Sequence, residues 1–517
     1  MVWSLTQKGF CEPATAGQFR GSNTFEHFEY QGDLDVFNPL PSMKTVLEAL
    51  TEFAHSQPDK KVWSFLNDSS EVNDSYTYKE LEKATDELAF QLIHTHNIRP
   101  ADRVLLVFFP GLAFTASLLA CFKANIVAVP VFPPDPRKLQ KDLDHFVSIQ
   151  KSSGATYVLT HSQYNYAKKV TDITSIFSTK NVSWPQLKWI VVDDMLAKGK
   201  KRKSMNLTTP NEKYSINTGD IAFLQYTSGS TSEPKGVMIS HANLAHNLVI
   251  ITKELQVDVN TTNLSWLPQY HDMGLIGSYM GTLYCGGVGY FLSPISFLKD
   301  PNVWLKSISI YRASHTQAPN FAYALAARKF AEHLKEQSRS SNNNSTTETL
   351  LNLTCVKHMI NAAEPVDVHA IASFYALFTQ YGLARNVIIP TYGLAEHTVF
   401  VCSGGRTLLS VNKSALEKTG AVEILSECLL NEYVEPVSQS PNSTGRKNGE
   451  HREIWVDSPS KALGYFNQPE LTQESFHGIM SSALTSRTYL RTGDMGFLYS
   501  DELFICGRVK DLIIIRG

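Results

Sequence analysis

Short apolar runs alternate with longer amphipathic stretches through most of the chain. A short apolar run bounded by turn residues is typical of a buried strand, and amphipathic stretches between such runs are typical of helices that cover a sheet. We therefore expect an α/β fold with parallel sheets covered by helices. The predicted strands are Val104–Phe109, Ile126–Val131, Tyr157–Thr160, Trp189–Val192, Ile221–Gln225, Val356–Ile360 and Val387–Ile389.

One uncharged stretch, Leu105–Phe122, is long enough to suggest a membrane span. Pro110 and Gly111 divide it into a strand-like run and a helix-like run, Ala113–Phe122. We interpret the stretch as buried α/β core and expect no membrane span.

The pattern changes twice along the chain. The polar segment 211–220 suggests a boundary, which predicts one α/β subdomain over residues 1–215 and a second over 216–400. After about Val401 helical periodicity fades, which predicts a small β-rich unit over 401–506. Its predicted strands are Glu453–Val456, Phe497–Tyr499 and Leu503–Ile505.

Composition and charge narrow the class of protein. Hydrophobic residues make up 43% and charged residues 19%, with a formal net charge of -2, so we expect an ordinary globular protein without a surface for nucleic acid. The basic cluster Lys198–Lys203 is interpreted as a solvated loop. The seven cysteines form no C-x-x-C pair and the first residues lack a secretory pattern, so we expect a reducing, cytoplasmic location.

The segment Tyr226–Gly236 reads Tyr-Thr-Ser-Gly-Ser-Thr-Ser-Glu-Pro-Lys-Gly. Hydroxyls, a mobile lysine and backbone N–H groups freed by glycine are the groups that bind a polyphosphate. The segment is not a Walker A loop, and both flanks read as strands, so we expect it to connect a hairpin. A flexible Ser/Gly turn is the alternative.

Two later segments, Val356–Val366 and Val387–Glu396, run from a strand into a loop. Loops that follow neighbouring parallel strands meet at the carboxyl edge of the sheet, where open α/β folds bind ligands. Tyr392 could stack on a base there and Glu396 could bind Mg²⁺ through oxygen, with a structural role for both as the alternative. Pro365 suits the first turn of a following helix. The apolar face predicted for that helix is Phe374, Leu377, Phe378 and Tyr381, with Gly382 at its end.

A third segment, Tyr489–Gly496, is followed closely by Ile505–Gly517. A carboxylate such as Asp494 can accept both hydroxyls of a ribose, and Arg508 cannot lose its charge. A β-turn with a surface ion pair is the alternative interpretation.

With these segments in one chain and in this order, the sequence resembles the adenylate-forming superfamily of acyl-CoA synthetases, luciferases and peptide-synthetase adenylation domains. The resemblance runs from about Thr45 to the last residue. Within the superfamily the chain is most similar to the fatty acyl-AMP ligases. The segments that carry this similarity are Gln225–Lys235, Trp266–Leu275, Ala318–Tyr323 and Tyr392–Thr398.

The resemblance implies a large N-terminal domain with two helix-covered sheet subdomains and a small β-rich subdomain. It implies that a long-chain fatty acid is activated with ATP and Mg²⁺ to an acyl-adenylate and pyrophosphate. The acyl group would then pass to an acyl carrier protein, or to a carrier domain of a polyketide or peptide synthase. A fatty acyl-CoA synthetase is one alternative, and a non-catalytic acyl- or nucleotide-binding homologue is another.

The resemblance also implies roles for individual residues. Lys235, Glu396 and His271 would be the catalytic residues, and Lys510 would be the hinge. Mg²⁺ would be bound by Glu396 and Thr227. The nucleotide would be bound by Thr227, Ser228, Gly229, Ser230, Thr231, Ala363, Glu364, Pro365, Tyr392, Gly393, Asp494 and Arg508.

Gly274, Gly277 and Gly281 would leave one side of a helix bare. The bare side could serve close helix packing, or it could form one wall of a narrow apolar tunnel. The resemblance favours the tunnel as the acyl pocket, with His271 near its mouth.

Three regions bear on how far the resemblance extends. Residues 402–428 lie where the fatty acyl-AMP ligases carry an insertion, which in those enzymes packs against the C-terminal domain and disfavours CoA thioester formation. Glu432–Arg452 reads as Ser/Asn/Pro-rich filler where the superfamily has a Gly-rich strand pair. Because the sequence ends at Gly517, just into the hinge segment 507–517, we expect it to lack the C-terminal lid and the lysine that the lid carries.

Overall fold

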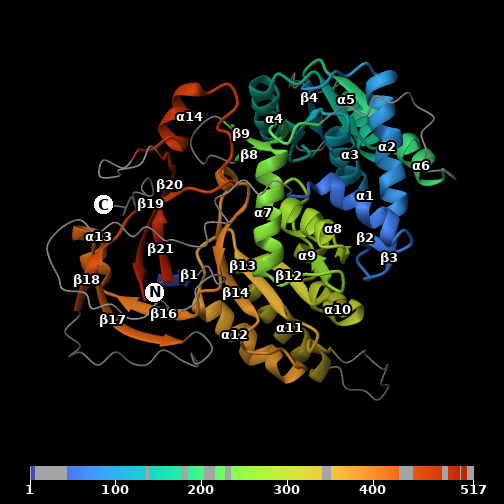
Figure 1. Cartoon of the computed structure of the whole chain (residues 1–517). Helices are drawn as coiled ribbons and strands as arrows, with labels where there is room; N and C mark the ends of the chain where they lie inside the picture. Colours follow the sequence, from blue (N-terminus) through green and yellow to red (C-terminus); the bar gives the residue numbers. More distant parts are fainter. Residues whose placement is uncertain are drawn as a thin grey trace.

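The computed structural model describes residues 2–5, 43–135, 139–175, 184–202, 216–227, 234–339, 351–429, 446–479, 487–500 and 502–508. Two helix-covered sheets lie beside each other, and an antiparallel sheet built mainly from the last third of the chain lies to one side of them (Figure 1). The predicted α/β fold with a β-rich unit is therefore confirmed.

The first sheet has the strand order β7-β6-β4-β5-β8-β9. Its strands are parallel except for the hairpin of β8 and β9, which pairs Thr227 with Lys235 next to the connecting loop. The predicted hairpin around the Ser/Gly-rich loop is thus present. The strands are β4 (Arg103–Leu106), β5 (Val127–Pro130), β6 (Tyr157–Thr160), β7 (Lys188–Val191), β8 (Ile221–Thr227) and β9 (Lys235–Ser240).

The second sheet has the order β15-β14-β13-β12-β10-β11-β2-β3. Its central strands are parallel, and antiparallel pairs with β15 and β3 form the two edges. The strands are β2 (Lys61–Leu66), β3 (Val72–Thr77), β10 (Thr262–Ser265), β11 (Val288–Phe291), β12 (His315–Pro319), β13 (His358–Ala362), β14 (Ile388–Gly393) and β15 (Phe400–Ser403).

The two α/β sheets exchange strands across residues 211–220. Strands β8 and β9 come after this segment but complete the first sheet, whereas β2 and β3 come before it and complete the second sheet. The segment therefore does not separate the two sheets, because pairing between strands distant in sequence decides which sheet each one joins. The division of the chain into subdomains stays a prediction.

The third sheet is antiparallel, with the order β18-β17-β16-β1-β21-β20-β19. Strands β16 and β17, with a helix between them, lie in the region predicted as an insertion. Strand β18 corrects the interpretation of Glu432–Arg452 as filler, because its described end is paired backbone. The strands are β1 (Val2–Leu5), β16 (Thr407–Val411), β17 (Ala421–Leu429), β18 (Arg446–Glu450), β19 (Arg452–Val456), β20 (Leu490–Tyr499) and β21 (Glu502–Arg508).

Capping side chains define where several helices begin. Thr45, Thr77 and Ser240 each accept a hydrogen bond from a backbone N–H of the first helical turn, and a side chain of that turn returns the bond. The helices are α1 (Val46–Ser56), α2 (Tyr78–His94), α3 (Leu112–Lys123), α4 (Leu139–Ser153), α5 (Ser162–Ser175), α6 (Asp193–Lys200), α7 (His241–Glu254), η2 (Met273–Met280), α8 (Gly281–Tyr284), α9 (Pro294–Lys299), α10 (Asn302–Tyr311), α11 (Asn320–Arg339), α12 (Val368–Phe378), η3 (Thr379–Tyr381), η4 (Ala395–His397), α13 (Lys413–Thr419) and α14 (Pro469–Phe476).

The helix predicted after Pro365 begins later than expected. Asp367 accepts a hydrogen bond from the His369 N–H and is the N-cap of α12, so Pro365 lies outside the helix. The predicted end is right, because Gly382 has a φ of 87° and ends the short helix that follows α12.

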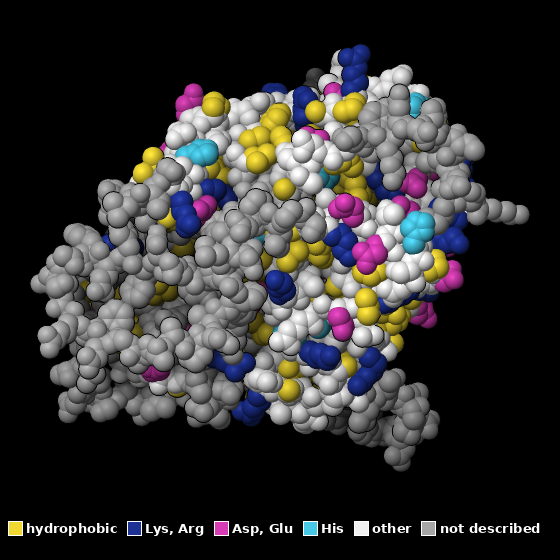
Figure 2. Space-filling view, viewed as in Figure 1, with side chains coloured by type: hydrophobic (Ala, Val, Ile, Leu, Met, Phe, Trp, Pro, Cys, Tyr) yellow, Lys and Arg dark blue, Asp and Glu magenta, His cyan; other side chains and the backbone are white. Residues whose placement is uncertain are grey.

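The long uncharged stretch forms β4 and α3, as its Pro-Gly break predicted. Among the helices that the structure describes, none has both the length and the apolar composition of a membrane span. Basic and acidic side chains are interspersed over the described part of the face in Figure 2. The solvated-loop interpretation of the basic cluster is wrong over its first residues, because Lys198 lies in α6 and its Nζ is 2.7 Å from Glu87 Oε1.

Three buried histidines make the unfolding free energy depend on pH. Burial lowers the pKa of His241, His315 and His397 from 6.5 to about 4. Between pH 4 and 6.5 the unfolded chain binds more protons than the folded one. The unfolding free energy is therefore highest, as far as these histidines determine it, above pH 6.5, and it decreases as the pH falls. We expect each imidazole to remove about 1.4 kcal/mol of unfolding free energy per pH unit in this window.

Urea unfolding between pH 7.5 and 4.5 would measure this slope, and His315→Asn should lower it. Glu254 acts in the opposite sense, because burial raises its pKa to about 7. Equal slopes for the wild-type and His315→Asn proteins would contradict the assignment.

Candidate functional site

The candidate site begins at the carboxyl edge of the second sheet. Strands β13 and β14 are parallel neighbours there, with Asn361 opposite Pro390, so the loops that follow them leave the sheet side by side. Ala363 has a φ of 70°, which turns the chain sharply after β13. The structure thus brings together the two loops that the sequence predicted to meet.

A set of polar contacts fixes the first loop. Asn361 Nδ2 donates to Asn320 Oδ1 over 3.1 Å, and the backbone N–H of Asp367 donates to the same oxygen over 3.0 Å. Glu364 Oε1 accepts from the backbone N–H of Phe321 over 2.6 Å, at the start of α11, where the helix dipole favours a carboxylate. Glu364 therefore holds the start of α11, and its place beside the adenine stays a prediction.

The end of β14, just before the second loop, carries Tyr392, and its side chain contacts the third sheet. Its hydroxyl donates a short hydrogen bond to Asp494 Oδ2, and Arg508 Nε donates to Asp494 Oδ1 over 3.1 Å. Asp494 and Arg508 face each other across β20 and β21. Burial, followed by the Asp494 carboxylate, raises the pKa of Tyr392 above its ordinary value, so the phenol stays a donor.

Gly393 follows Tyr392 and cannot carry a side chain without a change in the backbone. A Cβ atom at this position would lie 1.8 Å from the carbonyl oxygen of Val399. Glycine therefore allows the turn with Glu396 to fold back against β14.

A second group of contacts joins Glu396, Tyr465 and Lys235. Tyr465 Oη donates to Glu396 Oε1 over 2.8 Å, and Lys235 Nζ lies 5.1 Å from the centre of the Tyr465 ring. A cation at this distance from an aromatic ring is attracted to it. The two residues predicted for phosphate and metal binding are thus joined through one tyrosine.

Tyr465 was missed by the sequence analysis. It lies in a segment of the chain, 462–466, that runs antiparallel to β9 and forms a bridge opposite Val237. The available signal was the pair Gly464–Tyr465 shortly before the proline-started helix α14. Gly464 has a φ of 133°, a backbone conformation that favours glycine.

Backbone hydrogen bonds tie the segment 462–466 to both β9 and Glu396. Phe466 N–H donates to Gly236 O over 2.8 Å, and Met238 N–H donates to Gly464 O over 2.9 Å. At the other end Ala462 N–H donates to Glu396 O over 2.9 Å. The hairpin that holds Lys235 and the turn that holds Glu396 are therefore connected by main chain.

The predicted phosphate loop begins at the end of β8. Thr227 lies at the end of β8 opposite Lys235, at the base of the predicted phosphate loop. Ser228, Gly229, Ser230, Thr231 and the predicted hinge residue Lys510 lie outside the described residues.

His271 lies in a loop that is held from two sides. Gln225 Nε2 donates to Tyr270 O over 3.1 Å, and Gln269 Oε1 accepts from Gly111 N–H over 3.0 Å. The His271 side chain is 56% exposed, and its Nδ1 lies 2.6 Å from Asp272 Oδ1. The Asp272 carboxylate raises the pKa of His271. The loop thus presents an imidazole to solvent next to β8.

Of the glycines predicted for the acyl pocket, Gly274 and Gly277 lie in a π-helix, η2, and Gly281 begins the helix α8 that follows it. A Cβ atom at Gly274 would lie 2.3 Å from Pro268 O, and one at Gly277 would lie 2.6 Å from Gln317 Oε1. Close packing therefore accounts for these two glycines, and the ordinary helical spacing assumed for them is wrong. The tunnel stays a prediction.

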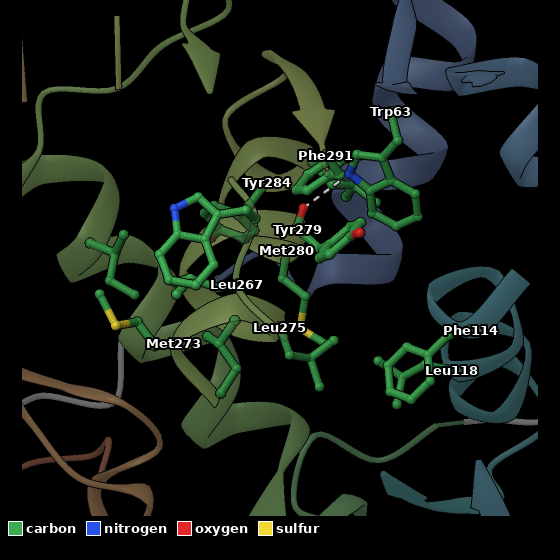
Figure 3. Close-up of a cluster of buried hydrophobic side chains, with 14 of the residues drawn as sticks. Trp63, Phe114, Leu118, Leu267, Met273, Leu275, Tyr279, Met280, Tyr284 and Phe291 are labelled. Carbon is green, nitrogen blue, oxygen red and sulfur yellow. Dashed lines mark hydrogen bonds between the residues drawn. The ribbon is translucent and has the colours of Figure 1, made fainter. Parts of the chain in front are cut away.

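Large side chains from η2 pack into the core beside these glycines (Figure 3). The ring of Tyr279 stacks on Phe291 at 3.6 Å between centroids, and Trp63 Nε1 donates to Tyr279 O over 3.2 Å. Aromatic packing thus fixes η2 against strands β2 and β11.

We expect Gly274→Ala to lower the unfolding free energy by about 1–3 kcal/mol, because the new methyl group would overlap main chain. Gly281→Ala is the matched control, since its Cβ would meet its nearest neighbour, Ile276 O, at an ordinary 3.4 Å. Urea unfolding of both variants would test this, and equal stability would contradict the close packing of η2.

Several known proteins are similar to this chain in sequence or in structure. The family model described as AMP-binding enzyme matches residues 50–466. A medium-chain-fatty-acid–acyl-carrier-protein ligase of Moorena producens is 34% identical over 92% of this chain and 78% of the relative. A ligase of the same description from Teredinibacter turnerae is 32% identical with the same coverage.

Among solved structures, the chain is similar to a fatty acyl-adenylate ligase from L. pneumophila in complex with acyl adenylate and pyrophosphate. The TM-score is 0.74 and the identity 32%, covering 92% of this chain and 79% of that chain.

Proposed function

This chain belongs to the AMP-binding enzyme family, and we propose that it activates a fatty acid with ATP to an acyl-adenylate, for transfer to an acyl carrier protein. The relatives named as fatty-acid–acyl-carrier-protein ligases support the substrate and the acceptor. The similar structure that holds an acyl adenylate supports the intermediate.

The observation that carries the proposal is the meeting of four parts of the chain around two carboxylates: β14 with the turn after it, the hairpin of β20 and β21, the segment 462–466 and β9. Tyr392 and Arg508 contact Asp494, while Tyr465 contacts Glu396 and lies under the Lys235 ammonium. A carboxylate held by a tyrosine can accept ribose hydroxyls at one end of a nucleotide. A second carboxylate beside a lysine suits the phosphate end.

In this proposal Tyr392 stacks on the adenine, with Ala363–Pro365 and Gly393 along its edge. Asp494 accepts from the ribose hydroxyls, and Arg508 lies near the same sugar. The phosphates lie at the loop from Thr227 to Lys235, where hydroxyls, backbone N–H groups and one ammonium offset their charge.

The residues present fit a magnesium ion. Glu396 Oε1 accepts from Tyr465, and among the described residues no hydrogen bond is found to Oε2, which leaves a hard oxygen ligand. Mg²⁺ is commonly bound by one or two carboxylates together with substrate phosphates, so Glu396 would hold it together with the Thr227 hydroxyl and the phosphates. When bound, the ion would neutralise phosphate charge as the leaving group departs.

The reaction needs no protein nucleophile. A carboxylate oxygen of the fatty acid attacks the α-phosphorus in line, forming the acyl–phosphate bond as the bond to the bridging oxygen of pyrophosphate breaks. Both reactants are anions, so the role of the protein is to align them and to offset their repulsion. Lys235 supplies positive charge, Asp494 orients the nucleoside, and His271 would lie near the fatty acid carboxylate.

We expect Tyr392→Ala and Asp494→Ala each to weaken ATP binding by about 1–3 kcal/mol, through lost stacking and lost ribose hydrogen bonds. Because the two side chains are hydrogen-bonded to each other, the double variant should lose less than the sum. Calorimetric titration would measure this, with the exposed Tyr166→Ala as control. Unchanged affinity in both single variants would rule out the proposed nucleotide site.

Pyrophosphate release from ATP and dodecanoate tests the proposed activity directly. We expect release by the wild-type protein and a loss of about 10²–10³ in rate for Lys235→Ala, since one preorganised charge is removed. Adding either CoA or a carrier protein bearing phosphopantetheine then identifies the acceptor. Thioester on CoA alone would favour the acyl-CoA synthetase instead, and absence of pyrophosphate would favour a non-catalytic homologue.

A further inference from the structure

The turn that carries Glu396 contains a strained residue. Thr398 has φ 68° and ψ −66°, and the Val399 N–H donates to His397 O over 2.8 Å, which closes a tight three-residue turn. Positive φ is rare for a β-branched residue, and this turn form is itself uncommon. Such a backbone persists only where its surroundings over-determine it, and it is found most often at functional sites.

Buried polar contacts surround this turn. Thr398 Oγ1 donates to Ser460 O over 2.8 Å. Asn247, from α7, pairs with both backbone groups of Phe400, accepting from its N–H over 3.1 Å and donating to its carbonyl over 2.9 Å. Asn247 Nδ2 also donates to Ser460 Oγ over 3.0 Å. Asn247, Thr398 and Ser460 are fully buried.

His397, the residue next to Glu396, connects the turn to the stretch that contains Ser458 and Ser460. Its Nδ1 lies 2.8 Å from Phe400 O and its Nε2 lies 2.6 Å from Ser458 Oγ. A carbonyl can only accept, so Nδ1 carries the proton, and Nε2 is left to accept from the Ser458 hydroxyl. Burial lowers the pKa of His397 to about 4, so the imidazole is neutral at physiological pH.

The stretch with Ser458 and Ser460 also connects to Glu396 through the residues that follow it. Ser458 and Ser460 lead directly into the segment 462–466, in which Ala462 N–H bonds to Glu396 O and Tyr465 Oη bonds to its carboxylate. His397 therefore fixes the relative position of the two stretches that hold the Glu396 main chain and side chain. An apolar side chain could fill the same volume, but it would not set this geometry.

We propose that His397 is a positioning residue: its two hydrogen bonds hold the strained turn so that the Glu396 carboxylate is directed at the metal and phosphates of bound ATP. The inference rests on the proposed function of the site. In this role His397 does not contact substrate, and it affects binding only through Glu396.

Binding of ATP with and without Mg²⁺ tests this role separately from turnover. His397→Leu removes both hydrogen bonds, and we expect it to weaken Mg²⁺-dependent ATP binding on the order of 10-fold, as loss of a supporting partner behind a metal ligand does. Affinity in the presence of EDTA should not change. His397→Asn, whose amide can donate to Phe400 O in place of Nδ1, should recover part of the loss.

His315→Leu is the matched control. His315 is also buried and also contacts a carbonyl and a serine hydroxyl, with Nε2 2.9 Å from Leu255 O and Nδ1 2.8 Å from Ser314 Oγ. It begins β12, at the end of the strand away from the site. We expect it to lower the melting temperature as His397→Leu does, with no change in Mg²⁺-dependent ATP binding.

Equal ATP affinities for the two leucine variants in the presence of Mg²⁺ would overturn the inference and leave a structural role. If His397→Leu does not fold, Ser458→Ala removes only the Nε2 contact and should shift Mg²⁺-dependent binding in the same direction. No shift in that variant would also overturn it. Absence of pyrophosphate release by the wild-type protein would refute the proposed function, while the binding measurements would still decide the role of His397.

Discussion

The main-chain pairing between β9 and the segment 462–466 holds the candidate site together. Strand β9 carries Lys235, the segment carries Tyr465, and its first residue, Ala462, bonds to the carbonyl of Glu396. Three parts of the chain that are far apart in sequence are thereby fixed by backbone hydrogen bonds. Their side chains can then be strongly polar, because they are not needed to hold the fold.

Each of the two carboxylates in the site accepts a hydrogen bond from a tyrosine. Tyr392 donates to Asp494 and Tyr465 donates to Glu396, and burial raises the pKa of both phenols, so they remain donors. One oxygen of each carboxylate is thus occupied by a neutral partner. The Glu396 carboxylate is oriented by this neutral donor alone, which would suit a cation, whereas Asp494 also accepts from the Arg508 guanidinium.

The sequence predicted the parts of this arrangement that depend on local pattern. Apolar runs identified strands, and the rule for parallel strand ends brought Ala363, after β13, and Tyr392, at the end of β14, to one edge. Tertiary contacts decided the rest. Gly274 and Gly277 pack against Pro268 and Gln317, partners that no helical periodicity reveals, and the helix takes the π form. Tyr465 was missed because its role comes from pairing with β9.

Strand β1 has a consequence for how the third sheet assembles. Val2–Leu5 pairs on one side with β16 and on the other with β21, so the first strand of the chain lies between strands from its last third. Contacts of such large sequence separation form late, because closing a long loop costs entropy before any pairing is gained. The N-terminal strand must therefore remain unpaired while most of the chain is synthesised. Both edges of β1 are therefore unpaired until β16 and β21 have been made, which leaves this strand open to mispairing during folding.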